Sequence, residues 1–176
     1  MFWHQKHKIQ ELLERFNMTD CKGAKPPIEV NFQNICSDDS PKCNVHQFES
    51  LIGSLQYIST WSRPDISFAV NILSRHLSDP REIHWKSAKR ILRYLKHTIN
   101  YCLVISPTQE QALQGFSDSS WAHDIVSRKS TSGNVLKLAG VLIDWKVAKQ
   151  NYVALSTAEA EYAALSQIST KIEIVI

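Results

Sequence analysis

The 176-residue chain lacks any apolar run near the ~20 residues that a membrane-spanning helix needs, so we expect no membrane partner. Its first residues, MFWHQKHKIQ, alternate charged and apolar side chains and contain no apolar core of the kind found in secretory signals. These two absences favour a protein of the cytoplasm or the nucleus.

Glycine is scarce, and cysteine follows no recognisable pattern. With five glycines and no GxSxG or GxxxxGK[ST] motif, the chain fits neither a serine hydrolase nor a phosphate-loop enzyme. The spacings between Cys21, Cys36, Cys43 and Cys102 match no zinc or redox motif. We therefore expect reduced thiols without a metal.

Net charge is small, at +3, but positive charge is concentrated between Arg81 and His97, where Glu82 is the single acid. On a helix the cations of this segment fall mostly opposite its apolar residues; they are Lys86, Lys89, Arg90, Arg93 and Lys96. Such a face either follows the phosphates of a nucleic acid or is merely solvated, and the sequence leaves both interpretations open.

Helical periodicity dominates the first hundred residues. Apolar residues recur at helical spacing over residues 5–16, 48–58, 63–73 and 85–95. Between the first two segments, Lys22 to Asn44 is rich in Gly, Pro, Ser and Asp, which predicts a boundary or an exposed crossing segment. We expect Gly53 to allow close packing of the second helix, and Arg63-Pro64-Asp65 to begin the third.

The last third of the chain has a different pattern. It predicts strands over about 112–118, 131–139 and 141–149, followed by one helix over about 157–170. The expected fold class is therefore α+β, with a helical segment over residues 1–105 and a sheet with one packed helix over residues 106–176.

Two acidic residues in this last third are candidate metal ligands. Asp118, in GFSDSSWA, ends a predicted strand, although a turn aspartate bonded to the backbone is equally consistent with its Ser-rich surroundings. Glu161, in STAEAEY, lies on the predicted helix. Glu159 points about 200° away from Glu161 on that helix, so we expect it to be a solvated first-turn acid, with Ser156 or Thr157 as N-cap. Carboxylates on separate elements are typical of two-metal Mg²⁺ sites.

Four motifs occur in order over Gly115 to Leu165: GFSDSSWA, SRKSTSG, IDWKVAKQ and STAEAEY. In order and spelling they resemble the ribonuclease H region of copia-type retrotransposon Pol polyproteins. The stretch Gln47 to His97 is similar to the helices that follow the polymerase palm in that family. The resemblance implies a reverse transcriptase C-terminal region, thumb-like or connection-like, over residues 1–105. It implies a ribonuclease H-like unit over residues 106–176.

The resemblance also implies a chemistry and a ligand set. Asp118 and Glu161 would be catalytic metal ligands for Mg²⁺, in a site that cleaves the RNA strand of an RNA–DNA hybrid by two-metal hydrolysis. Apart from the resemblance, the mixed basic and hydroxyl side chains of SRKSTSG favour contact of Arg128 and Lys129 with the phosphates of a hybrid duplex, or else only a polar hairpin turn. Ser120 departs from the family's DADWA-like pattern.

Several parts of the family pattern do not occur in these residues. The family's DNQSA-like motif with a third acid, its fourth acid and the YVDD-like palm motif are missing, and Glu173 is the sole acid after Leu165. We therefore expect an incomplete mixed sheet with an open edge beside residues 112–117, and no productively bound Mg²⁺. A non-catalytic nucleic-acid-binding protein and a decayed reading frame remain alternatives.

Overall fold

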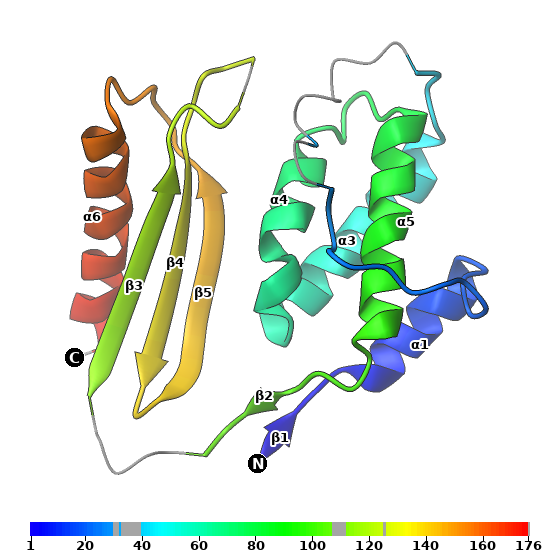
Figure 1. Ribbon diagram of the computed structural model, residues 1–176, viewed down its shortest axis with the longest axis horizontal. Coiled ribbons are helices and arrows are strands. Elements are labelled where there is room, and N and C mark those ends of the chain that lie inside the picture. Colours follow the sequence, from blue (N-terminus) through cyan, green and yellow to red (C-terminus); the bar gives the residue numbers. More distant parts are fainter. Residues whose placement is uncertain (30–31, 33–39, 107–111, 125, 176) are drawn as a thin grey trace. The chain divides into compact units, whose positions relative to one another are not determined.

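The computed structural model describes residues 1–29, 32, 40–106, 112–124 and 126–175 (Figure 1). The chain divides into two compact units, Trp3–Leu103 and Val104–Ile176 together with Met1–Phe2. Two short strands, β1 (Phe2–Trp3) and β2 (Leu103–Val104), pair in a ladder of their own. No helix in the described ranges is long and apolar enough to cross a membrane.

The unit Trp3–Leu103 is helical. Its elements are α1 (Lys6–Arg15), α3 (Val45–Trp61), the 3₁₀ turn η1 (Pro64–Ile66), α4 (Ser67–Ser74) and α5 (Glu82–His97). Each helix buries an apolar stripe in one core, which includes the fully buried Phe48, Leu55 and Leu92. The Asn44 side chain caps α3 by accepting a hydrogen bond from the Gln47 N–H at 3.0 Å. The four helices expected from periodicity are confirmed.

The long connection before α3 is packed in part. Residues 30–31 and 33–39 of the predicted loop lie outside the described residues. Ala24 and Phe32, which are described, are 8% and 3% exposed, and Phe32 belongs to the helical core. The expectation of an exposed crossing segment is therefore wrong for these two positions, because their apolar side chains are covered.

His84 is a buried histidine at the start of α5. Its side chain is almost fully covered, its Nδ1 accepts a hydrogen bond from the Arg81 N–H at 3.0 Å, and its ring stacks on His76 at 3.9 Å. Burial, followed by the positive neighbours His76 and Arg81, lowers the pKa of His84 from 6.5 to about 4. The imidazole is therefore neutral in the folded protein at pH 7.

This histidine predicts a pH-dependent stability. The unfolded chain binds a proton on His84 near pH 6.5 and the folded chain only near pH 4, so stability is full above pH 6.5 and is lost as pH falls toward 4. We expect the loss to reach about 3 kcal/mol near pH 4. In urea titrations between pH 4 and 7, His84→Gln should flatten this dependence, whereas His46→Gln, an exposed control, should not; equal profiles would contradict the account.

Arg63 is a buried cation that joins two parts of the helical unit. Its guanidinium is bonded to both carboxylate oxygens of Asp65, at 2.9 and 2.7 Å, and it donates to the Thr98 carbonyl at 3.2 Å. The Tyr94 hydroxyl donates to the same Asp65 carboxylate at 2.9 Å. Burial and that hydrogen bond raise the pKa of Tyr94 to about 12. Arg63-Pro64-Asp65 thus ties η1 to the end of α5 as well as beginning a helix.

The unit that follows Leu103 contains a three-stranded sheet and one helix. Its strands β3 (Leu113–Ser120), β4 (Thr131–Leu138) and β5 (Val141–Lys149) pair in the order β3-β4-β5, and α6 (Thr157–Val175) packs against β3 and β4 (Figure 1). Each strand begins and ends within two residues of its predicted bounds. Both pairings are antiparallel, so the mixed sheet is not observed in the described part, where β3 is an edge strand.

Gly115 brings β3 and α6 into close contact. A Cβ atom at this position would lie 2.9 Å from side-chain carbons of both Ile168 and Ile172. Polar contacts also hold α6 to the sheet, including an ion pair between Lys171 of α6 and Asp144 of β5. Since side chains alternate along a strand, Ser117 and Ser119 share the α6 side of the sheet with Gly115.

Candidate metal and nucleic-acid site

The helix acid Glu161 reaches the open edge of β3 beside Asp118. Its Oε1 accepts a hydrogen bond from the Ser119 backbone N–H at 3.3 Å. Asp118 is the preceding residue and is the partner of Gly133 across the β3–β4 ladder. Both acidic residues are exposed to solvent. The structure therefore brings the two predicted ligands to the same end of one strand, with Asp118 on the pleat opposite α6.

Glu159 has a different position, as the sequence predicts. The Glu159 N–H donates to the Ser156 hydroxyl at 3.1 Å, and the Glu159 carboxylate accepts from the Leu155 N–H at 2.7 Å. These contacts cap the start of α6. The prediction that Glu159 is a first-turn acid with Ser156 as cap is confirmed, and Glu161 is the acid of this pair that contacts β3.

The donors present suit Mg²⁺ in kind, because Asp118 and Glu161 offer exposed carboxylate oxygens at one edge. Mg²⁺ in proteins is often held by one or two carboxylates together with water and substrate phosphates. Within the described ranges, no group of three or more His, Cys, Asp or Glu side chains could hold a metal ion. Asp118 and Glu161 thus offer two exposed carboxylates at this end of β3.

The loop between β3 and β4 is organised by Asp124, a residue that the sequence analysis did not single out. Its carboxylate contacts Lys149 Nζ at 2.8 Å and accepts from the Ser127 N–H at 2.8 Å. Its backbone carbonyl accepts from the Arg128 N–H at 2.7 Å. Partial burial raises the pKa of Asp124, but the hydrogen bonds from Lys149 and Ser127 outweigh it and hold the pKa well below its usual range.

The predicted phosphate-contacting residues Arg128 and Lys129 lie in this loop. Arg128 is exposed and has a left-handed backbone, with φ of 56°. The Lys129 Nζ donates to the Asn151 carbonyl at 2.5 Å, which ties the loop to the segment after β5. The Trp121 indole N–H makes a second tie by donating to the Ala154 carbonyl at 3.0 Å.

Three of the five predicted phosphate contacts on α5 hold a neighbouring loop. Arg90 donates to the carbonyls of Pro26 and Lys25 and pairs with Glu29 at 3.0 Å. Arg93 and Lys96 each donate at 2.7 Å to the backbone carbonyls of residues 22 and 21. These contacts give a structural role to three of the five cations on the basic face of α5.

The other two cations on α5 are differently placed. Lys86 is exposed, and Lys89 Nζ lies 4.9 Å from the centre of the Trp85 ring. Lys89 and Trp85 line a groove of about 430 Å³ together with Arg15. The nucleic-acid prediction for α5 therefore depends on Lys86 and Lys89 more than on its other cations.

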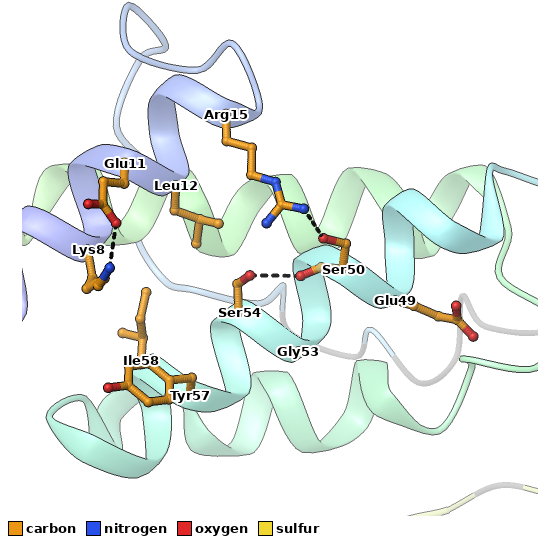
Figure 2. A pocket seen from close by; sticks show the side chains of 10 residues that line it. All are labelled: Lys8, Glu11, Leu12, Arg15, Glu49, Ser50, Gly53, Ser54, Tyr57 and Ile58. Atoms are coloured by element: carbon orange, nitrogen blue, oxygen red, sulfur yellow. Dashed lines mark hydrogen bonds and ion pairs between the residues drawn. The ribbon is translucent and has the colours of Figure 1, made fainter.

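A larger groove of about 680 Å³ lies between α1 and α3 (Figure 2). Figure 2 shows Arg15 from α1 bonded to Ser50 of α3, at 2.6 Å. Gly53 lies in the groove wall, where a Cβ atom would meet no heavy atom within 4 Å. The expectation that Gly53 permits close helix packing is therefore wrong, because this face of α3 is open.

Comparison with known proteins gives three informative matches. The chain is 45% identical over 118 residues to secreted RxLR effector protein 161 of Plasmopara viticola, a match that covers 67% of this chain and 83% of that protein. It is 37% identical over 169 residues to the retrovirus-related Pol polyprotein from transposon TNT 1-94 of Nicotiana tabacum, covering 93% and 13%. It is 34% identical over 166 residues to uncharacterized mitochondrial protein AtMg00810 of Arabidopsis thaliana, covering 94% and 68%.

These matches show which family the chain represents. Neither a family model nor a solved structure matches it. The chain belongs to the copia-type retrotransposon Pol polyprotein family, as its motifs suggest. It spans 13% of the length of the TNT 1-94 polyprotein.

Proposed function

We propose that Asp118 and Glu161 are two metal ligands of a ribonuclease H-type site, and that the chain binds RNA–DNA hybrids at this end of the sheet. The hydrogen bond from the Ser119 N–H to Glu161 carries the proposal, because it brings the helix acid to the residue next to the strand acid. Membership of a retrotransposon Pol family supports a nucleic-acid ligand.

The chemistry of the site follows from its two carboxylates. When bound, Mg²⁺ in a site of this class lowers the pKa of an attacking water and stabilises the leaving oxygen. Asp118 and Glu161 would supply oxygen ligands from the strand and the helix, and the contact with Ser119 orients the Glu161 carboxylate. Because two carboxylates leave most of an octahedral shell to water and phosphate, we propose that metal and hybrid bind cooperatively.

The polypeptide of residues 1–176 is expected to show no measurable Mg²⁺-dependent cleavage of a labelled RNA–DNA hybrid. Two carboxylates do not hold two Mg²⁺ ions in the near-octahedral oxygen geometry that this hydrolysis needs. The assay compares the unaltered chain with Asp118→Asn over a range of Mg²⁺ concentrations. Cleavage that requires Mg²⁺ and disappears in Asp118→Asn would contradict the two-ligand account.

Non-catalytic binding of nucleic acid through the helical unit is a second candidate function. The exposed Lys86, and Lys89 beside Arg15 in the smaller groove, favour it. On this proposal residues 1–105 correspond to the reverse transcriptase C-terminal region, and the helical unit binds the phosphates of a duplex without reading its sequence.

The salt dependence of duplex binding tests this second function. Replacing Lys86 and Lys89 with alanine should lower the slope of log affinity against log salt by up to about 2, one for each phosphate contact. Replacing Arg90 and Arg93 with alanine is the matched control. It should leave the slope nearly unchanged and lower thermal stability, because those side chains hold the loop of residues 21–29. If the Arg90 and Arg93 variant lowered the salt slope and the Lys86 and Lys89 variant did not, the assignment of phosphate contacts to Lys86 and Lys89 would be wrong.

A further inference from the structure

We propose that Asp124 is a positioning residue of the nucleic-acid site, which holds the loop between β3 and β4 so that Arg128 can contact a phosphate of the bound hybrid. The inference rests on the proposed function, since it assigns Arg128 to the same ligand as Asp118 and Glu161. It adds to that function a residue that contacts no ligand and acts through the backbone of its own loop.

The contacts of Asp124 close the loop from several directions. The carboxylate is only 15% exposed and bonds Lys149 of β5 and the Ser127 N–H. The backbone of Asp124 makes two more bonds, since its N–H donates to the Lys129 carbonyl at 3.1 Å and its carbonyl accepts from the Arg128 N–H. One residue thus fixes the backbone on both sides of Arg128 and ties it to the third strand.

The backbone of Arg128 needs such support. A left-handed φ is unfavourable for a residue with a Cβ atom and persists where the surrounding structure imposes it. The Arg128 side chain is exposed. Its guanidinium makes no hydrogen bond or ion pair to any residue that the structure describes. The loop therefore presents one cation whose donors are available to a ligand, in a conformation that Asp124 maintains.

The position of the loop connects Arg128 to the two acids. Ser120 and Thr131 form the last pair of the β3–β4 ladder, so Asp118 lies two residues before the end of β3 and Arg128 three residues before the start of β4. At about 3.3 Å per residue, Asp118 is roughly 7 Å from the end of its strand. Arg128 therefore belongs to the loop at the end of the ladder where Asp118 lies, and arginine binds phosphate oxygens through paired N–H groups.

A double-mutant cycle on hybrid binding tests the positioning role. Arg128→Gly removes the side chain without straining the backbone and should weaken affinity for a fluorescent RNA–DNA hybrid roughly three- to tenfold, as for one hydrogen bond. Asp124→Ala should weaken it by a similar factor, and the double variant no further, because both changes remove one contact. Asp124→Asn, which keeps an acceptor for Ser127, should recover part of the loss. If the loss of affinity in the double variant equalled the product of the two single losses, the inference would be wrong.

A second readout needs no nucleic acid. In Asp124→Ala the Ser127 and Arg128 amide protons should exchange with solvent at least tenfold faster, while those of β4 keep their protection. Unchanged exchange at both amides would overturn the positioning role even if binding fell. A chain that binds no hybrid at all would refute the proposed function, and the inference with it. Binding with multiplying effects would refute the inference alone.

Discussion

Asp65→Ala is expected to lower the free energy of unfolding of the helical unit by about 3–5 kcal/mol. The change removes the carboxylate that neutralises Arg63, whose own side chain is 3% exposed. Arg63 would keep its contacts with Thr98 but would carry an uncompensated buried charge. The Tyr94 hydroxyl would also lose its acceptor. Urea denaturation followed by far-ultraviolet circular dichroism measures the effect.

An exposed ion pair of the same chemistry provides the control. Glu29 pairs with Arg90 at 3.0 Å, but the Glu29 side chain is 57% exposed. Exposed pairs contribute little, so Glu29→Ala should change stability by less than about 1 kcal/mol. If Asp65→Ala and Glu29→Ala lowered the free energy of unfolding equally, burial of Arg63 would not explain the importance of its ion pair.

Gly115→Ala is expected to destabilise the sheet unit by about 2–3 kcal/mol, in the upper part of the range for overpacked positions. The new methyl group would lie 2.9 Å from carbons of Ile168 and Ile172, so α6 must move away from β3. That movement should also lengthen the contact between Glu161 and the Ser119 N–H. Hydrogen exchange at the amides of β3 and β4 reports the stability of this unit.

Gly133 is the matched control, because it is a strand glycine whose added Cβ would meet no heavy atom within 4 Å. Gly133→Ala should leave stability within about 0.5 kcal/mol of the parent chain. Combining Gly115→Ala with Ile172→Val should recover part of the loss, because valine lacks the Cδ1 atom that lies 2.9 Å from the added Cβ. If Gly133→Ala were as damaging as Gly115→Ala, the close approach of α6 would not be the cause.

Elements with a strong local signal could be predicted from the sequence. Ile9, Leu12 and Leu13 recur at helical spacing, and the structure buries all three on α1. The strands follow breaks in that periodicity, so β3, β4 and β5 begin and end within two residues of the predicted bounds. Ser156 and Glu159 carry a capping pattern that needs only neighbouring residues, and it too was predictable.

Contacts between distant residues were not predictable in this way. The acceptor that anchors Arg63 besides Asp65 is Thr98, 35 residues away. The carbonyl that Arg93 contacts belongs to Lys22, 71 residues away, so a face that looks solvated or phosphate-binding is partly occupied. Periodicity also does not show which glycine faces a helix.

The candidate site also contains residues that the sequence indicated and contacts that only the structure showed. Asp118 and Glu161 were found through the resemblance to copia-type proteins, and their shared place at the β3 edge needed the structure. Asp124 was missed, although an Asp that precedes a Ser by three residues in a polar loop is typical of turns closed by a side chain. Its pairing with Lys149 links a loop to a strand 25 residues later, which no local pattern indicates.

Paramagnetic broadening by Mn²⁺ tests the shared metal site most directly. Mn²⁺ prefers the same oxygen ligands as Mg²⁺, and its unpaired electrons broaden nearby amide resonances. We predict selective broadening at Ser119 and Glu161, lost in Asp118→Asn and in Glu161→Gln but kept in Glu159→Gln. Broadening that survives both ligand substitutions, or that is centred elsewhere on the chain, would contradict the claim that Asp118 and Glu161 bind one metal ion.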